Sequence, residues 1–355
     1  MGKTDIIFSF DSEDYLTPQA ADAELWWAEN LASRGLRGSW QLVGELVRSL
    51  QATGRGDVIS ALAQHEIGFH SNFHSLPPTI PEVVEGMSLA EALDYIYKTE
   101  TAGVESLAAT FGRWPISYCS PGDSWTPATL LAMARMGIKI FCNDKLADFE
   151  NKPYWYCGLL VTSYSFDFQD FYDDDVFEPG RFERNFEELK ARAPEDGVIV
   201  IYTHPTRLVT ARFWDEPFAD GRRVAIADAP AAPLRTPDEI ERCKQRCAGW
   251  LDWLAARDDL RFTDFATVYS ERAASARSLD TLLQESNLAP GREGELPLRT
   301  SGSEAYMPSK VFDSFRYDWL PYPEDFTGEA LIEQARQLTW TAAPAIKAAA
   351  AAGRE

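Results

Sequence analysis

Strand and helix signals alternate along the first 270 residues of this 355-residue chain, and that alternation restricts the folds it can adopt. Short apolar runs bounded by turn residues are typical of buried strands, and capped segments with apolar residues three or four apart are typical of helices. Eight runs are expected as strands, at residues 5–10, 39–44, 65–70, 116–120, 138–143, 158–165, 198–203 and 260–265. Seven or eight strand–helix units in succession predict a parallel α/β barrel.

Capping signals place helices between these strands. Thr17, which a proline follows, is expected to cap a helix that ends near Gly35. Ser88 opens a capping box and a long helix that reaches about Phe111. Thr236 is expected to cap the last helix before the final strand.

The chain changes character after residue 270. Residues 271–304 are polar and rich in turn formers, and residues 305–328 carry aromatic residues and prolines without a clear period. An alanine-rich helix is expected at the end. The sequence therefore predicts a barrel of residues 1–270 and a C-terminal extension of residues 271–355, mainly helical or irregular, which packs on the barrel and frays at its end.

Composition argues against two classes of partner. With a formal net charge of −21 and a sequence pI of about 4.6, the chain repels nucleic acid and anionic membranes. No signal peptide or membrane span is visible, so a cytoplasmic location is expected. The five cysteines form no CxxC motif. Cys243 and Cys247 share the apolar face of a predicted helix, so we expect buried thiols there rather than a metal pair.

Three of the four histidines lie at the end of a predicted strand or just after it, as does an acidic cluster at residues 11–14. His70 is the last residue of the third predicted strand, His74 comes four residues later, and His204 follows the seventh. Barrel enzymes carry their catalytic groups on the rim formed by the carboxyl ends of the strands. Two histidines and one carboxylate make a three-ligand metal site with a position left for water, and zinc hydrolases generate their nucleophile in such sites.

The spacing of His70 and His74 favours shared ligation. Residues four apart on a helical turn face the same way, so both rings could reach one ion. Ser71 is expected to hydrogen-bond the local backbone. His65 stands five residues before His70, which is not the spacing of the HExxH motif, and it is expected to be a turn residue.

In its motifs the chain resembles the polysaccharide deacetylase superfamily, also called the NodB-homology or carbohydrate esterase family 4 group. The resemblance covers about residues 4–270 and implies a distorted (β/α) barrel of NodB type. Five segments carry it, in the order of the family: FSFDSEDY at 8–15, His70-Ser-Asn-Phe-His74, Cys119-Ser-Pro-Gly122, Asp167-Phe-Gln-Asp170-Phe171 and VIVIYTHPTR with His204.

The resemblance implies a set of metal ligands. Asp14, His70 and His74 correspond to the family's metal triad, with Zn²⁺ the usual ion and Co²⁺ or Ni²⁺ as alternatives. Asp11 and Glu13 both precede Asp14, and either could be the catalytic base. Asp11 is favoured as the base. A turn after Asp11 would bring Asp14 to the histidines and leave Asp11 at the strand end, near the metal-bound water.

The resemblance also implies the groups that handle the leaving amine and the oxyanion. His204 corresponds to the catalytic acid, and Asp170 corresponds to the carboxylate that orients it. The backbone N–H of Gly122 corresponds to the oxyanion donor. One departure stands out, because Cys119 occupies the place of the family arginine that pairs with the base; Arg113 and Arg207 are candidate substitutes.

The implied activity is metal-dependent hydrolysis of a non-peptide carbon–nitrogen bond. N-deacetylation of an N-acetylated carbohydrate is the favoured reaction. Two alternatives stay open: hydrolysis of a small non-sugar amide or cyclic imide, as in allantoinase-like members, and a catalytically silent carbohydrate-binding barrel. The expected partner is correspondingly an N-acetylated carbohydrate or a small amide.

Overall fold

The computed structural model describes residues 3–74, 76–123, 125–142, 152–193, 197–278 and 281–282. Residues 283–355, which make up most of the expected C-terminal extension, lie outside the described residues, so the packing of the extension stays a prediction.

The regular elements follow the expected alternation in outline, but residues 158–165, which were expected as one strand, are divided between two strands that lie toward opposite ends of the sheet order. The strands are β1 (Thr4–Ser12), β2 (Ser39–Leu42), β3 (Glu66–Phe69), β4 (Ser117–Cys119), β5 (Ile140–Cys142), β6 (Tyr154–Tyr156), β7 (Leu159–Thr162), β8 (Tyr164–Asp167), β9 (Val198–Thr203), β10 (Leu260–Phe262) and β11 (Arg277–Ser278). The α-helices are α1 (Ala20–Ser33), α2 (Gly44–Ala52), α3 (Gly56–Leu62), α4 (Ile80–Val84), α5 (Leu89–Phe111), α6 (Pro127–Arg135), α7 (Arg181–Arg192), α8 (Pro237–Ala255) and α9 (Phe265–Arg272). Short 3₁₀ turns are η1 (Pro121–Asp123), η2 (Gln169–Tyr172), η3 (Pro205–Leu208), η4 (Glu216–Gly221) and η5 (Ile226–Asp228).

In the described part of the chain the strands form one curled sheet. Its order is β11-β6-β7-β5-β4-β3-β2-β1-β9-β8, with β10 also paired to β1, and only the β6–β7 pair is antiparallel. β7 lies near one end of this order and β8 at the other, yet Ser163 alone separates them in the chain. The sheet must therefore curl until its two ends approach each other. This arrangement confirms the predicted distorted α/β barrel.

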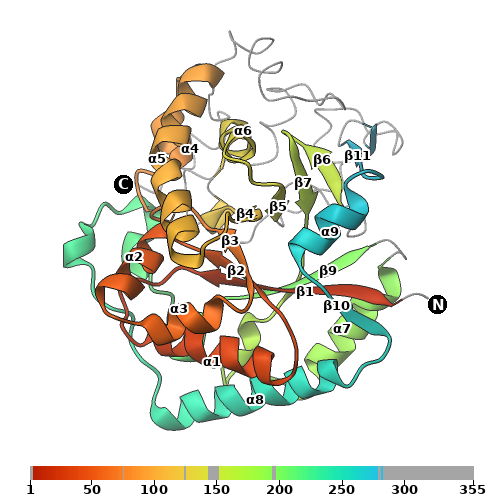
Figure 1. Ribbon diagram of the computed structural model, residues 1–355. Coiled ribbons are helices and arrows are strands. Elements are labelled where there is room, and N and C mark those ends of the chain that lie inside the picture. Colours follow the sequence, from red (N-terminus) through yellow and green to blue (C-terminus); the bar gives the residue numbers. More distant parts are fainter. Residues whose placement is uncertain are drawn as a thin grey trace.

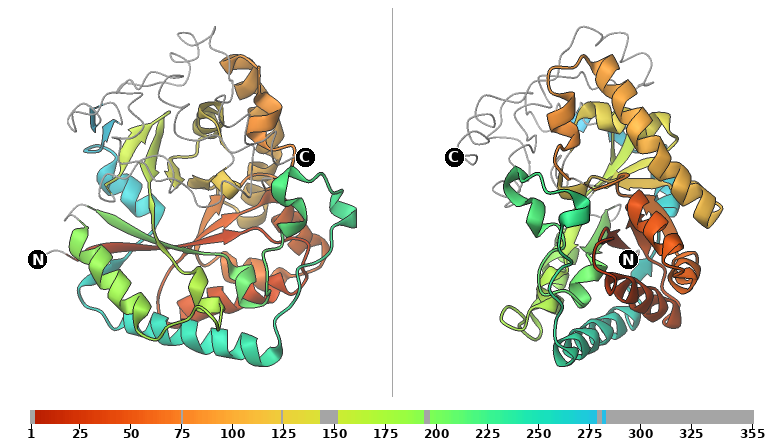
Figure 2. Two further views of the ribbon diagram at one scale, coloured as in Figure 1. Left: turned by 180° about the vertical axis from the view of Figure 1, so that it is seen from behind. Right: turned by 90° about the vertical axis from the view of Figure 1, so that its left-hand side faces the viewer.

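Helices cover the outside of the sheet (Figure 1). Near β1 the cover is α1, α3 and α8, and Figure 2 shows α8 running along the outside of the molecule. Aromatic packing joins these layers: Phe10 of β1 stacks on Trp40 of β2 with ring centroids 4.3 Å apart, and it also contacts Trp27 of α1. A smaller apolar cluster that includes Ile7 of β1 and Val200 of β9 is separate from this main core.

Two of the three predicted caps are confirmed. The capping boxes at Ser88 and Thr236 are both present, and they open α5 and α8. The prediction at Thr17 is wrong, because α1 begins only at Ala20; the Thr17 hydroxyl accepts instead from the backbone N–H of Ala232, which ties down a distant segment.

Two further observations concern the helices. Cys243 and Cys247 are fully buried on α8 as free thiols, as expected. Within the described residues, no helix has the length and the apolar character that a membrane crossing requires.

Candidate metal and catalytic site

Side chains of β1 alternate between the helix layer and the barrel interior. Phe10 and Ser12 face the helices, where the Ser12 hydroxyl donates to Glu24 of α1 (2.9 Å). Asp11 and Glu13 have the opposite orientation and meet side chains of β4, β8 and the loop after β3. The period of two that a strand imposes is therefore kept to the end of the acidic cluster. The expected turn after Asp11 does not occur.

Glu13 lies against both histidines of the loop after β3. Its Oε2 atom is 2.8 Å from Nε2 of His74 and 3.3 Å from Nε2 of His70, and all three side chains are at most 3% exposed. Burial alone would raise the pKa of Glu13, but the positive charges of His74 and His204 and the hydrogen bond with the His74 ring hold it well below its usual range. The same carboxylate raises the pKa of His74 against the effect of burial.

The bonding of His70 fits a divalent metal ion. Its Nδ1 atom lies 3.0 Å from the carbonyl oxygen of Cys119, and because a carbonyl only accepts, Nδ1 carries the proton. Its Nε2 lone pair is buried, has no hydrogen-bond partner among the described residues and faces the Glu13 carboxylate. Two acceptors so placed repel each other unless a cation or a proton lies between them. One ring nitrogen of each histidine and a carboxylate oxygen of Glu13 lie within 4.8 Å of one another, which suits a tetrahedral zinc-type ion with one open position.

The loop that carries the two histidines is not the helical turn that their spacing predicted. Ser71 and His74 both have left-handed backbone angles, with φ of 67° and 69°. The Ser71 hydroxyl accepts from the backbone N–H of His74 (2.8 Å), as expected, and the carboxylate of Glu100 accepts from that of Asn72 (2.8 Å). Side-chain hydrogen bonds therefore maintain a backbone shape that non-glycine residues rarely adopt.

Trp214 is a site residue that the sequence did not reveal. Its indole N–H donates to Oε1 of Glu13 (2.9 Å), and its fully buried ring packs edge-on against His74 with centroids 5.1 Å apart. Trp214 reaches the site because residues 210–234 form a long excursion after β9, closed at its base by an antiparallel bridge between Thr210 and Leu234. No spacing in the sequence signals this contact.

Asp14 does not meet the two histidines. Its Oδ1 atom accepts from the backbone N–H groups of Leu16 (3.1 Å) and Thr17 (2.9 Å), and its Oδ2 atom accepts from the Thr206 hydroxyl (2.7 Å). Burial raises its pKa, although these hydrogen bonds act in the opposite direction. Asp14 therefore connects the end of β1 to η3, the turn that follows His204.

Asp11 is a buried carboxylate held by uncharged groups. The Tyr164 hydroxyl donates to its Oδ1 atom (2.5 Å), and the Cys119 sulfur lies 3.9 Å from its Oδ2 atom. Within the described residues no lysine or arginine contacts Asp11. Arg113 donates to the His65 carbonyl and Arg207 pairs with Asp173, so both proposed substitutes are engaged elsewhere.

His204 is close to the carboxylates of Asp11 and Glu13, which both face the barrel interior. Its Nε2 atom lies 3.8 Å from Oδ2 of Asp11 and 3.9 Å from Oε2 of Glu13. Its Nδ1 atom lies 2.5 Å from the side-chain amide of Gln169, and the ring of Phe213 packs perpendicular to it at 5.0 Å. An amide offers either an oxygen or an NH₂ group by turning over, so Gln169 can contact the ring in either protonation state. We call Asp11, Glu13, His70, His74 and His204 the strand-end cluster.

The structure separates Asp170 from the histidine that it was expected to orient. Asp170 is half exposed, and its Oδ2 atom pairs with Arg181 of α7 at 2.5 Å. Gln169, one residue earlier in η2, takes the place beside His204. Gly122 lies in η1 directly after β4, in the left-handed region with φ of 50°. It is thus at the same strand ends as the cluster.

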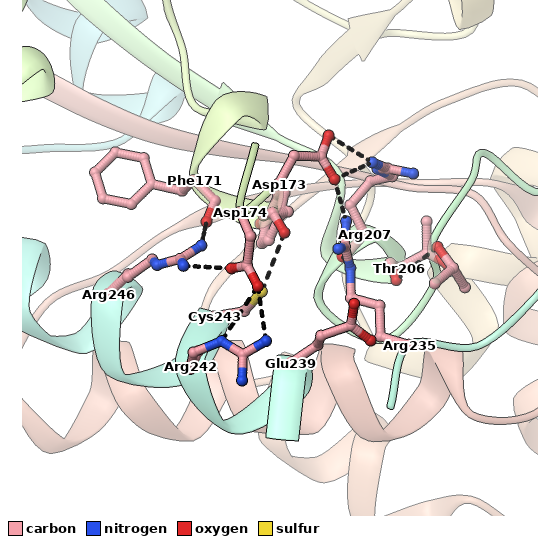
Figure 3. A network of polar contacts seen from close by, with 12 residues as sticks. Phe171, Asp173, Asp174, Thr206, Arg207, Arg235, Glu239, Arg242, Cys243 and Arg246 are labelled. Atoms are coloured by element: carbon pink, nitrogen blue, oxygen red, sulfur yellow. Dashed lines mark hydrogen bonds and ion pairs between the residues drawn. The ribbon is translucent and has the colours of Figure 1, made fainter. Parts of the chain in front are cut away.

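A second group of charges connects the residues that follow η2 with η3 and α8 (Figure 3). Asp173 accepts from Arg207 (3.2 Å) and Arg235 (2.7 Å), and Asp174 pairs with Arg242 (2.7 Å) and with Arg246. The guanidinium of Arg207 also lies 5.0 Å from the ring centroid of Phe213, the residue that packs on His204. We call the two aspartates and four arginines the arginine network.

Comparison with known proteins informs the fold. No family model matches the chain, and no curated protein matches its sequence. The 4-alpha-glucanotransferase from Thermococcus litoralis is similar in structure with a TM-score of 0.52 and 12% identity, over 78% of this chain and 42% of that one. A protein from Mycobacterium smegmatis assigned provisionally as a polysaccharide deacetylase gives 0.49 and 20%, over 78% and 93%. A family 4 carbohydrate esterase from Streptomyces lividans, in complex with acetate, gives 0.36 and 13%, over 70% and 91%.

At these identities the likeness concerns the fold alone. Proteins described as a polysaccharide deacetylase and as a family 4 carbohydrate esterase are among the solved structures that are similar in fold.

Proposed function

We propose that this protein is a metal-dependent hydrolase of non-peptide amide bonds that removes acetyl groups from N-acetylated carbohydrates. The observation that supports this most is the buried Nε2 atom of His70, which has no hydrogen-bond partner in the described part of the chain and faces the Glu13 carboxylate beside His74. Two imidazoles and one carboxylate at the carboxyl ends of barrel strands form the ligand set of a hydrolytic zinc site. We assign the activity to the barrel of residues 1–270.

In this proposal Glu13, His70 and His74 hold the ion, and Glu13 replaces Asp14 in the set implied by the resemblance. A bound Zn²⁺, Co²⁺ or Ni²⁺ would polarise the amide carbonyl and lower the pKa of a bound water. Trp214 keeps one oxygen of Glu13 occupied, so the other oxygen remains for the ion. Asp14 then has a structural role, because its carboxylate accepts from the backbone N–H groups of Leu16 and Thr17 and from the Thr206 hydroxyl.

Proton transfer falls to Asp11 and His204. Asp11 presents Oδ2 toward the site and accepts a proton from the attacking water. His204 presents Nε2 within 4 Å of both inward carboxylates and donates a proton to the departing amine. The backbone N–H of Gly122 supports the oxyanion. The net reaction converts an amide and water to a carboxylic acid and an amine.

Acetate release tests the proposal. Chitin oligosaccharides, which are chains of N-acetylglucosamine, are incubated with the chelator-treated protein, with the same protein reloaded with Zn²⁺, and with a His70→Ala/His74→Ala double variant. We expect acetate only from the reloaded wild-type protein. Equal release with and without chelator, or from the double variant, contradicts metal dependence. Activity of the reloaded protein on small amides but on no acetylated sugar contradicts the carbohydrate assignment.

A further inference from the structure

The carboxylate of Asp11 is oriented without a cation. The side chain is buried, with a hydroxyl, a thiol and an imidazole as its neighbours. A buried carboxylate with a free torsion could turn either oxygen toward the site, and proton transfer depends on the position of the accepting atom. Some group must therefore fix the torsion.

Tyr164 is built to hold that carboxylate. Tyr164 is the first residue of β8, the strand at one end of the curled sheet. Because the sheet curls, its side chain meets those of β1 and β4 inside the barrel. Its ring is buried and stacks on Tyr202 of β9, with centroids 4.2 Å apart and ring planes at 7°. Burial and the nearby Asp11 charge raise the pKa of Tyr164 well above its usual range, so the hydroxyl remains a donor at ordinary pH.

The two oxygens of Asp11 have different surroundings. Oδ1 accepts the hydrogen bond from Tyr164, and Oδ2 faces Nε2 of His204 at 3.8 Å. The Cys119 sulfur lies 3.0 Å from the Tyr164 oxygen, so a side chain larger than cysteine at position 119 would displace the hydroxyl. Cys119 and Tyr164 therefore act as a pair in the place where the related motif carries an arginine.

We propose that Tyr164 is the positioning residue of Asp11: its hydroxyl holds Oδ1 and thereby directs Oδ2 to the water that attacks the amide. This inference rests on the proposed function for the identity of the base. The hydrogen bond itself does not depend on which amide is hydrolysed.

The test is Tyr164→Phe, which deletes the hydroxyl and keeps the ring stack on Tyr202. We expect kcat to fall about 10- to 100-fold, because a misplaced reacting group is costly, while KM and bound zinc stay within about twofold. Tyr118→Phe is the matched control. Its hydroxyl is also buried, lies on β4 and has no hydrogen-bond partner among the described residues, so its kcat should equal that of wild type.

Crystal structures of the wild type and of Tyr164→Phe supply a readout that needs no substrate. The carboxylate of Asp11 should keep one orientation in the wild type and should turn or become disordered in the variant. An unchanged carboxylate together with an unchanged kcat overturns the proposal, as does loss of zinc in the variant. If no acetylated substrate is turned over but the carboxylate moves, the proposed function fails and the positioning role stands.

Discussion

The strand-end cluster and the arginine network are neighbours, but their carboxylates differ in how they are paired with positive charge. In the network each aspartate is paired with two arginines. In the cluster two carboxylates face three histidines, and within the described residues no lysine or arginine contacts either carboxylate. Paired charges connect elements, whereas incompletely paired buried charges are costly and mark sites of chemistry.

Exposure sharpens the comparison. The aspartates of the network are 39–40% exposed, so water already stabilises them. The carboxylates of the cluster are at most 6% exposed, and burial removes that help. A divalent ion would balance the negative charge of the carboxylates in the cluster. In the network, arginines and water already stabilise the aspartates. Substitutions in the two groups should therefore differ in which property they change, as well as in the size of the change.

The largest expected effect comes from Glu13. Glu13→Gln removes the charge of the proposed ligand, and we expect zinc affinity to fall by more than about 100-fold, beyond the loss typical of a residue that only supports a ligand. Activity should be lost with the metal. Asp14→Asn is the neighbouring control and should keep stoichiometric zinc by elemental analysis. Zinc retained by Glu13→Gln and lost by Asp14→Asn would restore the ligand set that the resemblance implied.

His204→Ala should be next in size. We expect kcat to fall about 10²- to 10⁴-fold, the range for a positioned acid, with zinc still bound. Gln169→Ala should show a smaller loss in the same direction, since Gln169 contacts Nδ1 and not the reacting atoms. Steady-state kinetics and metal analysis of the same preparations separate the roles. Loss of zinc from His204→Ala would make His204 a ligand.

Trp214→Phe tests the support of Glu13. The variant keeps an aromatic ring over His74 but loses the indole N–H that donates to Oε1. We expect zinc affinity to fall about 10- to 100-fold, which is typical when the partner of a metal ligand is removed. Competition with a chromogenic chelator measures it. Affinity equal to that of wild type would show that Glu13 is held by other contacts.

The smallest effects should come from the arginine network. Asp173→Asn weakens the contacts of buried Arg207, so we expect a loss of about 1–3 kcal/mol in unfolding free energy, while zinc affinity is unchanged. Asp174→Asn alters a half-exposed pair and should cost at most about 1 kcal/mol. Urea denaturation measures both. Metal loss in either variant would mean that the network and the cluster are not separate in function.

Local patterns in the sequence were enough to predict the class of fold and most of the side chains that meet in the strand-end cluster. Strand and helix periods predicted the barrel, and the capping boxes at Ser88 and Thr236 located two helices. Placement after strands also brought His70, His74 and His204 to one rim. These features follow from local chemistry, which a linear pattern records.

Strand pairing selects which of two adjacent residues in a motif reaches the strand-end cluster. β1 stays extended through Ser12 because Ser12 pairs with Leu42 of β2, and strand alternation then turns Glu13, not Asp14, to the histidines. In η2, likewise, Gln169 contacts His204, whereas the adjacent Asp170 pairs with Arg181. Pairing between strands is a long-range property, so no local signal fixed these choices.

Two further contacts have no local signal at all. Trp214 arrives through the excursion after β9, and Tyr164 arrives because the sheet curls until β8 closes it. Each donates to a carboxylate at the end of β1 or just after it, more than 150 positions away in the chain. The chain encodes which chemical groups are present, but only the closed sheet determines which of them meet, because the contacts form between segments whose separation the sequence pattern does not record.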